Sequence, residues 1–258
     1  MIKDHLQNLY DQLPSAVKLV AVSKFHPVER LREAYDAGQR IFAESRPQEF
    51  AAKVPQLPSD IEWHFIGHLQ TNKLKLVLPY VSLVQSVDSL HLLEAIDQWG
   101  RAHGRVTDVL LELHLGAEET KQGFLEEDIL AIINEGWEGV GPETVASRPL
   151  PSQAMGPSLL CGRGWPQVSG PTPSQPCVKH YRIRGLMGMA TNTEDEAVIE
   201  GDFARIEALF QRIRDAHPEL AETFTELSIG MSADWPIAVR HGATMVRIGT
   251  DIFGPREY

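Results

Sequence analysis

The chain has 258 residues, 43% of them hydrophobic, and a formal net charge of −11 at pH 7. This size allows one α/β barrel of roughly 250 residues, and the acidic charge argues against a general nucleic-acid-binding protein, because a phosphate backbone attracts positive charge. The sequence has two cysteines, Cys161 and Cys177, and neither a charged-then-apolar leader nor a long apolar span. We therefore expect a cytoplasmic protein that does not bind membranes.

Segments of strand and helix character alternate along the chain after a short amphipathic helix at Met1–Leu13. Eight strands are predicted, at Val17–Val22, Arg40–Phe42, Glu62–Ile66, Ser82–Val87, Val106–Leu115, Arg182–Met187, Glu226–Ile229 and Thr244–Ile248. Helices are predicted between them at Val28–Gly38, Gln48–Val54, Gln70–Leu78, Ser89–His103, Leu125–Glu135, Glu194–Ala216 and Trp235–His241. This alternation favours a parallel sheet, and eight strands favour closure into a (β/α)8 TIM barrel over an open doubly wound sheet.

One segment, Gly136–Cys177, interrupts the pattern with seven glycines and eight prolines in 42 residues and no apolar period. Its composition cannot fill a core, so we expect a disordered or loosely packed insertion within a single domain, residues 1–258. The insertion follows a helix, so we expect it on the amino-terminal side of the barrel. In a reducing compartment, Cys161 and Cys177 are expected to be free thiols.

Lys24 lies just past the carboxyl end of the first predicted strand, in the stretch VKLVAVSKFHP at Val17–Pro27. In parallel α/β folds, ligands bind at the carboxyl ends of the strands. Lys24 is therefore a candidate functional residue, with an ordinary surface lysine as the alternative. Other side chains predicted near this edge include His64 after the third strand and Met187 after the sixth.

Turns with glycine and hydroxyl residues follow the last two strands, where barrels commonly bind phosphate through backbone N–H groups and a helix N-terminus. The candidate phosphate-site residues are Ser228, Gly230, Ser232, Gly249 and Thr250. The alternative is that these are merely tight turns, which also favour glycine. Their position after the seventh and eighth strands favours phosphate binding.

A lysine on one side of the barrel mouth and a phosphate site on the other suggest a phosphorylated carbonyl compound held as a Schiff base. Pyridoxal 5′-phosphate (PLP) meets this requirement, with its aldehyde bonded to Lys24 and Arg247 directed at its ring nitrogen. An arginine, which is effectively always charged, would keep that nitrogen unprotonated and weaken the cofactor as an electron sink. A phosphate contact or a salt bridge at the rim is the alternative for Arg247.

Several longer motifs resemble those of the pyridoxal-phosphate homeostasis proteins, which are single-domain PLP-binding barrels similar to the N-terminal domain of alanine racemase. These motifs are AVSK (Ala21–Lys24), WHFIGHLQTNK (Trp63–Lys73), KQGF (Lys121–Phe124), GLMGMAT (Gly185–Thr191), LSIGMSADWPIAV (Leu227–Val239) and GATMVRIGTDIFG (Gly242–Gly254). The resemblance covers essentially the whole chain except Gly136–Cys177.

The resemblance implies that Lys24 is the Schiff-base lysine, that Arg247 is the partner of the pyridine ring, and that the two turns form the phosphate site. It further implies a role in buffering or carrying PLP that affects amino-acid and keto-acid balance without robust enzymatic activity. PLP-accepting apo-enzymes are the implied protein partners.

The second turn departs from the family pattern. That pattern is Gly-Glu-Asn, two residues and Gln-Glu, whereas the chain has AESRPQE at Ala43–Glu49. Ser45 thus replaces an asparagine expected near the cofactor, so a direct hydrogen bond to the ring hydroxyl would be lost or bridged by water. The predicted cofactor-binding residues are Lys24, Ser45, His64, Met187, Ser228, Gly230, Met231, Ser232, Arg247, Gly249 and Thr250.

Catalysis by this chain is not predicted. A racemase needs two acid–base groups on opposite faces of the substrate, and in the related racemases one comes from a second domain of the partner subunit, which we do not expect here. We expect a monomer with an open site, which suits loading and release better than carbanion chemistry. The histidines, His64, His68 and His114, are more commonly packed than proton-transferring, and neither they nor the cysteines show metal-ligand spacing.

Three alternatives stay open. The first is a weak PLP-dependent enzyme such as an amino-acid racemase. The second is a barrel enzyme that acts on a phosphorylated sugar or aldehyde without PLP. The third is a scaffolding role through Gly136–Cys177, which would leave the polar rim unexplained.

Overall fold

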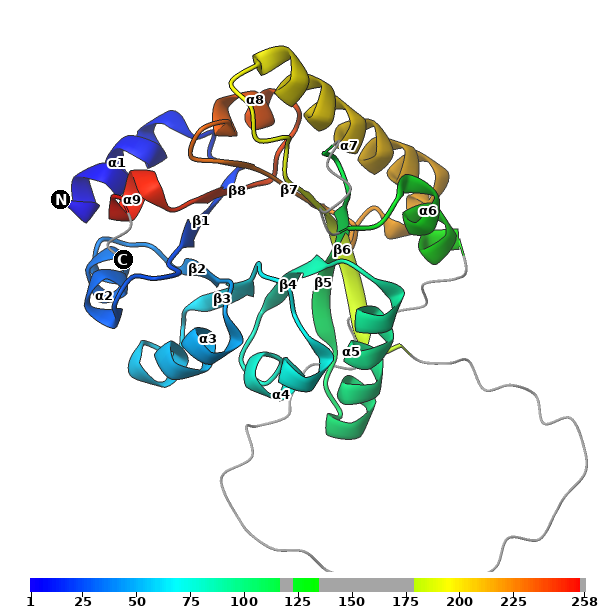
Figure 1. Cartoon of the computed structure of the whole chain (residues 1–258), viewed down its shortest axis with the longest axis horizontal. Coiled ribbons are helices and arrows are strands. Elements are labelled where there is room, and N and C mark those ends of the chain that lie inside the picture. Colours follow the sequence, from blue (N-terminus) through cyan, green and yellow to red (C-terminus); the bar gives the residue numbers. More distant parts are fainter. Residues whose placement is uncertain (117–122, 135–178, 256–258) are drawn as a thin grey trace, which may run out of the picture.

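The computed structural model describes residues 1–116, 123–134 and 179–255. Eight parallel strands form a closed barrel in which each strand pairs with the next along the chain and β8 pairs with β1 (Figure 1). The strands are β1 (Lys18–Val22), β2 (Ile41–Glu44), β3 (Glu62–Phe65), β4 (Leu83–Val87), β5 (Thr107–Leu113), β6 (Tyr181–Gly188), β7 (Glu226–Met231) and β8 (Met245–Ile248). The predicted (β/α)8 barrel is confirmed, whereas the predicted insertion Gly136–Cys177 lies outside the described residues.

Helices surround the barrel on its outside (Figure 1). They are α1 (Ile2–Gln12), α2 (Val28–Asp36), α3 (Pro47–Lys53), α4 (Leu74–Val77), α5 (Leu90–His103), α6 (Glu126–Asn134), α7 (Glu196–Ala216), α8 (Trp235–Arg240) and α9 (Thr250–Phe253). Helix α1 packs beside α9, where His5 Nδ1 lies 3.0 Å from the backbone oxygen of Ile252. Within the described part of the chain, no helix combines the length and apolarity needed to cross a membrane.

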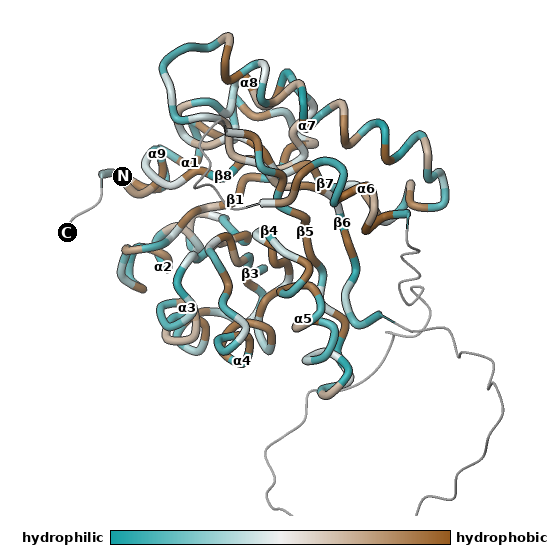
Figure 2. The backbone as a smooth tube through the Cα atoms, turned by 45° about the vertical axis from the view of Figure 1, so that its right-hand side comes forward, coloured by the Kyte–Doolittle hydropathy of each residue, from teal (hydrophilic) through white to brown (hydrophobic). Residues whose placement is uncertain are grey.

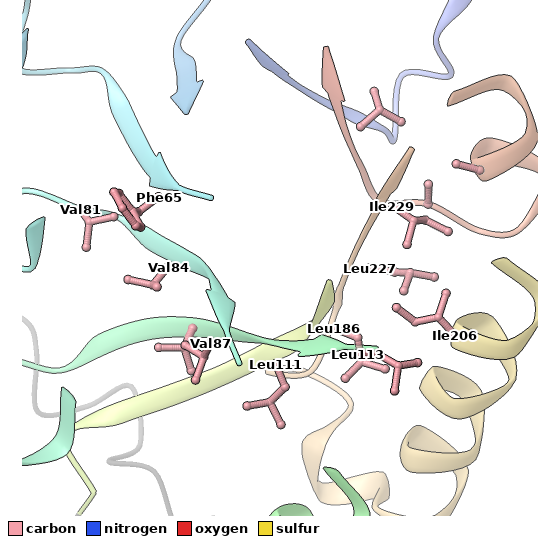
Figure 3. Packing of buried hydrophobic residues seen from close by; sticks show 14 of the residues in the cluster. Phe65, Val81, Val84, Val87, Leu111, Leu113, Leu186, Ile206, Leu227 and Ile229 are labelled. Carbon is pink, nitrogen blue, oxygen red and sulfur yellow. The ribbon is translucent and has the colours of Figure 1, made fainter. Parts of the chain in front are cut away.

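The larger apolar layer lies between the strands and the helices. In Figure 3, Leu113, Leu186 and Leu227 of β5, β6 and β7 lie close to Ile206 of α7. Helix α7 buries residues at intervals of three and four, which places them on one face, and Figure 2 shows the resulting alternation of hydrophobic and hydrophilic residues along it. Each fully buried aliphatic side chain contributes about 1.5–3 kcal/mol, so this layer provides most of the driving force for folding.

A smaller apolar cluster fills the barrel interior and consists of Val20, Ala43, Leu83, Leu110, Met187 and Met245. Buried polar side chains cross the same space: Ser228 Oγ donates to Gln85 Oε1 at 2.7 Å, and Gln85 Nε2 lies 2.7 Å from His64 Nδ1. Successive strand residues face opposite sides of the sheet, which is why each strand supplies both layers. The filled interior leaves one cavity at the carboxyl ends of the strands and another at the amino ends.

Some element boundaries differ from the sequence-based expectations. Strand β2 continues to Glu44, because the carboxylate is buried and hydrogen-bonded rather than exposed in a turn. Strand β7 continues through Gly230 to Met231. The predicted helix Gln70–Leu78 is a single 3₁₀ turn at Thr71–Lys73 followed by the short α4, and α9 was not predicted as a helix.

Candidate functional site

A cavity of about 270 Å³ opens at the carboxyl ends of the strands. Seven of the eleven residues predicted to bind a cofactor line it, namely Lys24, Met187, Met231, Ser232, Arg247, Gly249 and Thr250. The remaining lining residues are Val22, His26, Ile66, Met189, Ala233 and Gly254. Residues from both ends of the chain therefore meet around one space, as the barrel topology requires.

Lys24 lies on the connection that leaves β1, two residues beyond the strand end. His26 lines the cavity from the same connection, and its ring stacks on Phe253 of α9 at a centroid distance of 4.8 Å. The β1 connection thereby contacts the segment that follows β8. The lysine is held at the rim where β1 and β8 meet.

Arg247 is buried on β8, with 4% of its surface exposed, and it also lines the cavity. Its Nη1 donates to both the backbone oxygen and Oγ of Ser228 at 2.7 Å, and its Nη2 donates to the backbone oxygen of Gly188 at 2.9 Å. Burial lowers the pKa of Arg247 to about 10, and nearby Glu112 and Asp234 oppose this shift. The guanidinium is therefore still protonated at pH 7 and is fixed in orientation by β6 and β7.

Two further turns border the cavity, one after β7 and one after β8. In the turn from β7 to α8, the backbone N–H of Met231 donates to Asp234 Oδ1, which holds Ser232 at the rim. Gly249 precedes α9, and a Cβ there would lie 3.1 Å from the backbone oxygen of Val22. A side chain at this position would crowd β1, so glycine allows β8 and β1 to approach closely at the rim.

Four of the predicted residues do not line this cavity. Ser45 is half-buried in the connection after β2. His64 is 3% exposed and lines the cavity at the opposite end of the barrel. Ser228 is fully buried beneath Arg247, and Gly230, at φ +91°, packs against Trp235 and Ala238 of α8. Ser228 and Gly230 thus lie one layer behind the lining, where they support Arg247 and the β7 turn.

Burial lowers the pKa of His64 to about 3, with the positive charge of Lys18 adding to the shift. The imidazole is therefore neutral at pH 7. It contacts Gln85 in the row of buried polar side chains inside the barrel. A packed position of this kind was the commoner alternative expected for this histidine.

Sequence reasoning did not select His26 or Glu112. His26 stands only two residues after Lys24, and this spacing was its one signal. Glu112 is a carboxylate in the apolar strand β5, on the inward face that Leu110 shares. Burial raises the pKa of Glu112 to about 7, Asp88 adds to this shift, and Arg247 and His68 oppose it.

The charge of the cavity lining is positive. It contains one lysine, one arginine and one histidine, and within the described part of the chain no aspartate or glutamate contributes to it. Three methionines, Met187, Met189 and Met231, supply apolar surface beside these charges. Such a lining suits an anionic ligand with an apolar body. Among residues 1–116, 123–134 and 179–255, no three His, Cys, Asp or Glu side chains gather into a metal site.

Comparison with known proteins gives the class first. The family model described as alanine racemase, N-terminal domain, matches residues 1–147, which is more than half of the chain. Together with the closed eight-stranded barrel, this match defines an alanine racemase N-terminal-type barrel protein.

Individual relatives identify the family within this class. The pyridoxal phosphate homeostasis protein of Pasteurella multocida is 32% identical over 263 residues, covering 100% of this chain and 95% of that protein. That of Aquifex aeolicus is 31% identical over 95% of this chain and 89% of its own length. The chain therefore belongs to the pyridoxal phosphate homeostasis protein family, which confirms the resemblance of the sequence motifs.

A solved relative covers the same range. PipY of Synechococcus elongatus, in the structure with PLP bound, is 33% identical with a TM-score of 0.75, covering 98% of this chain and 100% of that chain. The PipY structure without PLP has a TM-score of 0.78. The barrel is thus shared along nearly the full chain.

Proposed function

We propose that this protein binds PLP in the cavity at the carboxyl ends of its strands and serves intracellular PLP homeostasis. The observation that carries the proposal is the arrangement of Lys24, Arg247 and the two hydroxyl-bearing turns around one cavity, to whose lining no described aspartate or glutamate contributes. The names of the relatives and the PLP-bound PipY structure support the same function. The positive lining fits the phosphate, and the methionine surface fits the ring.

Each lining group has a separate role in this proposal. PLP would supply an aldehyde, with which Lys24 Nζ would form a Schiff base as water leaves. Ser232 and Thr250 would donate their hydroxyls to the phosphate, with backbone N–H groups of the same turns. Arg247, charged and fixed by three hydrogen bonds, would bind the ring nitrogen and keep it unprotonated.

The four residues away from the lining receive different roles. Ser228 and Gly230 support Arg247 and the phosphate turn from behind. Ser45, shorter than the asparagine of the family pattern, reaches the cofactor only through water. His64 is not part of the proposed site, since it lines the cavity at the other end of the barrel.

The proposal includes release as well as binding. Met189 and Met231 line the cavity and are 39% and 37% exposed, so the cavity reaches the surface. A cofactor held there can pass to PLP-accepting apo-enzymes, which we propose as recipients, with this protein acting as a cytoplasmic monomer. Gel filtration and transfer assays with apo-enzymes examine these points separately.

The experiment that tests the proposed function is an absorbance spectrum of the purified protein with PLP, before and after borohydride, followed by peptide mass analysis. We expect a Schiff-base band that borohydride abolishes, with reduced PLP attached to the peptide containing Lys24. Absence of both the band and the labelled peptide would refute PLP binding by this lysine and favour the phosphorylated-sugar alternative.

A further inference from the structure

The residue that follows Lys24 has an unusual backbone conformation. Phe25 has φ +70° and is, among the described residues, the one non-glycine residue with positive φ. Bulky L-residues are strained in this region and stay there only when their surroundings hold them. The direction in which the chain leaves Lys24 is therefore imposed by neighbouring groups.

Those neighbours come from one short segment, β2 and α3. The backbone N–H of Phe25 donates to Glu49 Oε1 at 2.7 Å, and the guanidinium of Arg46 lies 4.3 Å from the centre of the Phe25 ring. On the other side of Lys24, Ser23 Oγ donates to Glu44 Oε1 at 2.6 Å. The residues that flank the lysine are thus both held by the same unit.

Lys53 joins these contacts into one cluster. Its Nζ donates to the backbone oxygen of Ser23 at 2.9 Å, to Glu44 Oε1 at 2.7 Å and to Glu49 Oε1 at 2.6 Å. Lys53 and Glu44 are 5% and 0% exposed, so both charges have been removed from water. Burying a charge is unfavourable unless it is paired and hydrogen-bonded. Apolar residues of similar volume would fill the same space with a smaller desolvation penalty than this charged cluster.

We propose that Glu44, Glu49 and Lys53 are positioning residues that lock the Ser23–Phe25 turn and thereby aim Lys24 at the reacting carbon of the ligand in the cavity. This inference rests on the proposed function, which it deepens. The three side chains line no cavity that the structure describes, so they act through the backbone on either side of Lys24 rather than by touching the ligand.

The proposal separates two parts of ligand binding. The phosphate turns and Arg247 come from β7 and β8, whereas the hydrogen bonds of Glu49 and Lys53 join them to each other and to Ser23, Phe25 and Glu44. When the contacts of Glu49 or Lys53 with the Ser23–Phe25 turn are removed, Phe25 relaxes towards negative φ and Lys24 no longer points at the reacting carbon. The contacts to the phosphate and the ring stay in place. Bond formation with Lys24 should therefore weaken without loss of the non-covalent site.

The test uses Glu49→Ala with Asp97→Ala as its matched control. Asp97 likewise accepts a backbone N–H, that of His180 at 2.6 Å, and pairs with a basic side chain, Arg101, at 3.1 Å, but it lies on α5 away from the cavity. Two ligands are compared for each protein: PLP, and pyridoxine 5′-phosphate, which lacks the aldehyde and cannot react with Lys24.

We expect Glu49→Ala to slow Schiff-base formation with PLP by about tenfold, because small misplacements of a reacting group have large effects on rate. Its dissociation constant for pyridoxine 5′-phosphate should stay within about twofold of the wild-type value, as should both quantities in Asp97→Ala. In Glu49→Gln the amide oxygen still accepts from Phe25, and the rate should recover to within about threefold of wild type.

Two results would overturn the proposal: an unchanged rate in Glu49→Ala, or a parallel loss of both ligands, which indicates a structural role only. Should Glu49→Ala not fold, Arg46→Ala removes an exposed contact to Phe25 and is expected to slow the reaction by about threefold.

If wild-type protein forms no Schiff base, the proposed function fails by itself. Acetylation of Lys24 in the PLP-free proteins, followed by mass spectrometry, then decides the positioning role: a changed rate in Glu49→Ala supports it, and an unchanged rate refutes it.

Discussion

The two ends of the barrel hold cavities of opposite character. At the amino ends of the strands, a cavity of about 190 Å³ is lined by Lys18 and Arg184 together with Glu62, Asp108 and Glu226. Four of these charges form pairs of opposite sign: Lys18 with Glu226, and Arg184 with Asp108. At the carboxyl ends, Arg247 donates instead to two backbone oxygens and one hydroxyl, and the described lining contains no carboxylate.

Under the proposed function, this difference separates charges that stabilise the fold from charges that bind a ligand. Pairs of opposite sign at the amino end satisfy each other and leave little net field for an anion. At the carboxyl end, Glu112 and Asp234 act on Arg247 from outside the lining, and the described lining itself holds basic side chains without a carboxylate, which favours an anionic ligand. Four comparisons each set a change at or near the carboxyl end against a similar change elsewhere.

The largest effect is expected from replacing the two lysines near the ends of β1: Lys24, two residues beyond its last residue, and Lys18, its first residue. Lys24→Ala should abolish borohydride-stable incorporation of PLP, because the amine that condenses with the aldehyde is gone. Lys18→Ala, at the other end of the strand, should incorporate PLP like the wild type. Peptide mass analysis after reduction measures both, and equal labelling of the two variants would contradict the assignment of Lys24.

A second comparison concerns pH. Burial raises the pKa of Glu112 from 4.5 to about 7, so its contribution to stability is present below about pH 4.5 and is lost as the pH rises through about 7. Glu112→Gln should remove this dependence, which amounts to about 3 kcal/mol. Urea unfolding of wild type and variant from pH 4.5 to 7.5 gives the difference in unfolding free energy, which should change steadily with pH. Parallel curves would refute the burial of an ionisable Glu112.

His64, at the opposite cavity, should show the reverse sign. Burial lowers its pKa from 6.5 to about 3, so its contribution is present above about pH 6.5 and is lost as the pH falls towards 3. His64→Gln should therefore lose less stability than the wild type on acidification. Between about pH 4.5 and 6.5, a rise in pH lowers the stability contribution of Glu112 and raises that of His64. The wild-type curve shows only the sum of the two, so the single variants are needed to separate them.

The third comparison uses two glycines of positive φ. A Cβ at Gly230 would lie 2.6 Å from the Ala238 Cβ, whereas a Cβ at Gly242 would meet only a carboxylate oxygen of Glu207 at 3.8 Å. Both alanine variants suffer the strain of positive φ, but Gly230→Ala also overpacks β7 against α8. We expect it to be less stable than Gly242→Ala by about 2 kcal/mol in urea unfolding. Equal losses would show that α8 can shift to accept the methyl group.

The smallest effect is expected from two threonine hydroxyls. Thr250→Val removes a hydroxyl at the cavity rim and should weaken binding of pyridoxine 5′-phosphate by about tenfold, the value of one hydrogen bond to a charged group. Thr107→Val, on the first residue of β5, removes a buried Oγ1 that has no hydrogen-bond partner. That variant should bind normally and be at least as stable as the wild type. Unchanged binding by Thr250→Val would remove its hydroxyl from the phosphate site.

Prediction from sequence succeeded where the signal was local. The apolar run of β1 and the helix at Glu194–Ala216, which corresponds to α7, were predicted directly, because strands and helices leave local patterns in the sequence. The rim positions of Lys24, Ser232 and Thr250 followed from strand order alone, since parallel strands end at the same edge. Glu44 could not be assigned in this way. Its burial depends on Lys53, nine residues later, and on Ser23, twenty-one residues earlier.

The sequence by itself determined the alternation of strands and helices, the eight-stranded barrel and the rim to which Lys24 belongs, because these depend on periodicity and chain order. Only the tertiary structure decided which polar residues face the cavity, because that depends on side-chain direction within each strand. His64 and Ser228 point into a filled interior, whereas Arg247, two residues after Met245, reaches the cavity. The contacts that hold the Ser23–Phe25 turn likewise form only after β1, β2 and α3 have packed together.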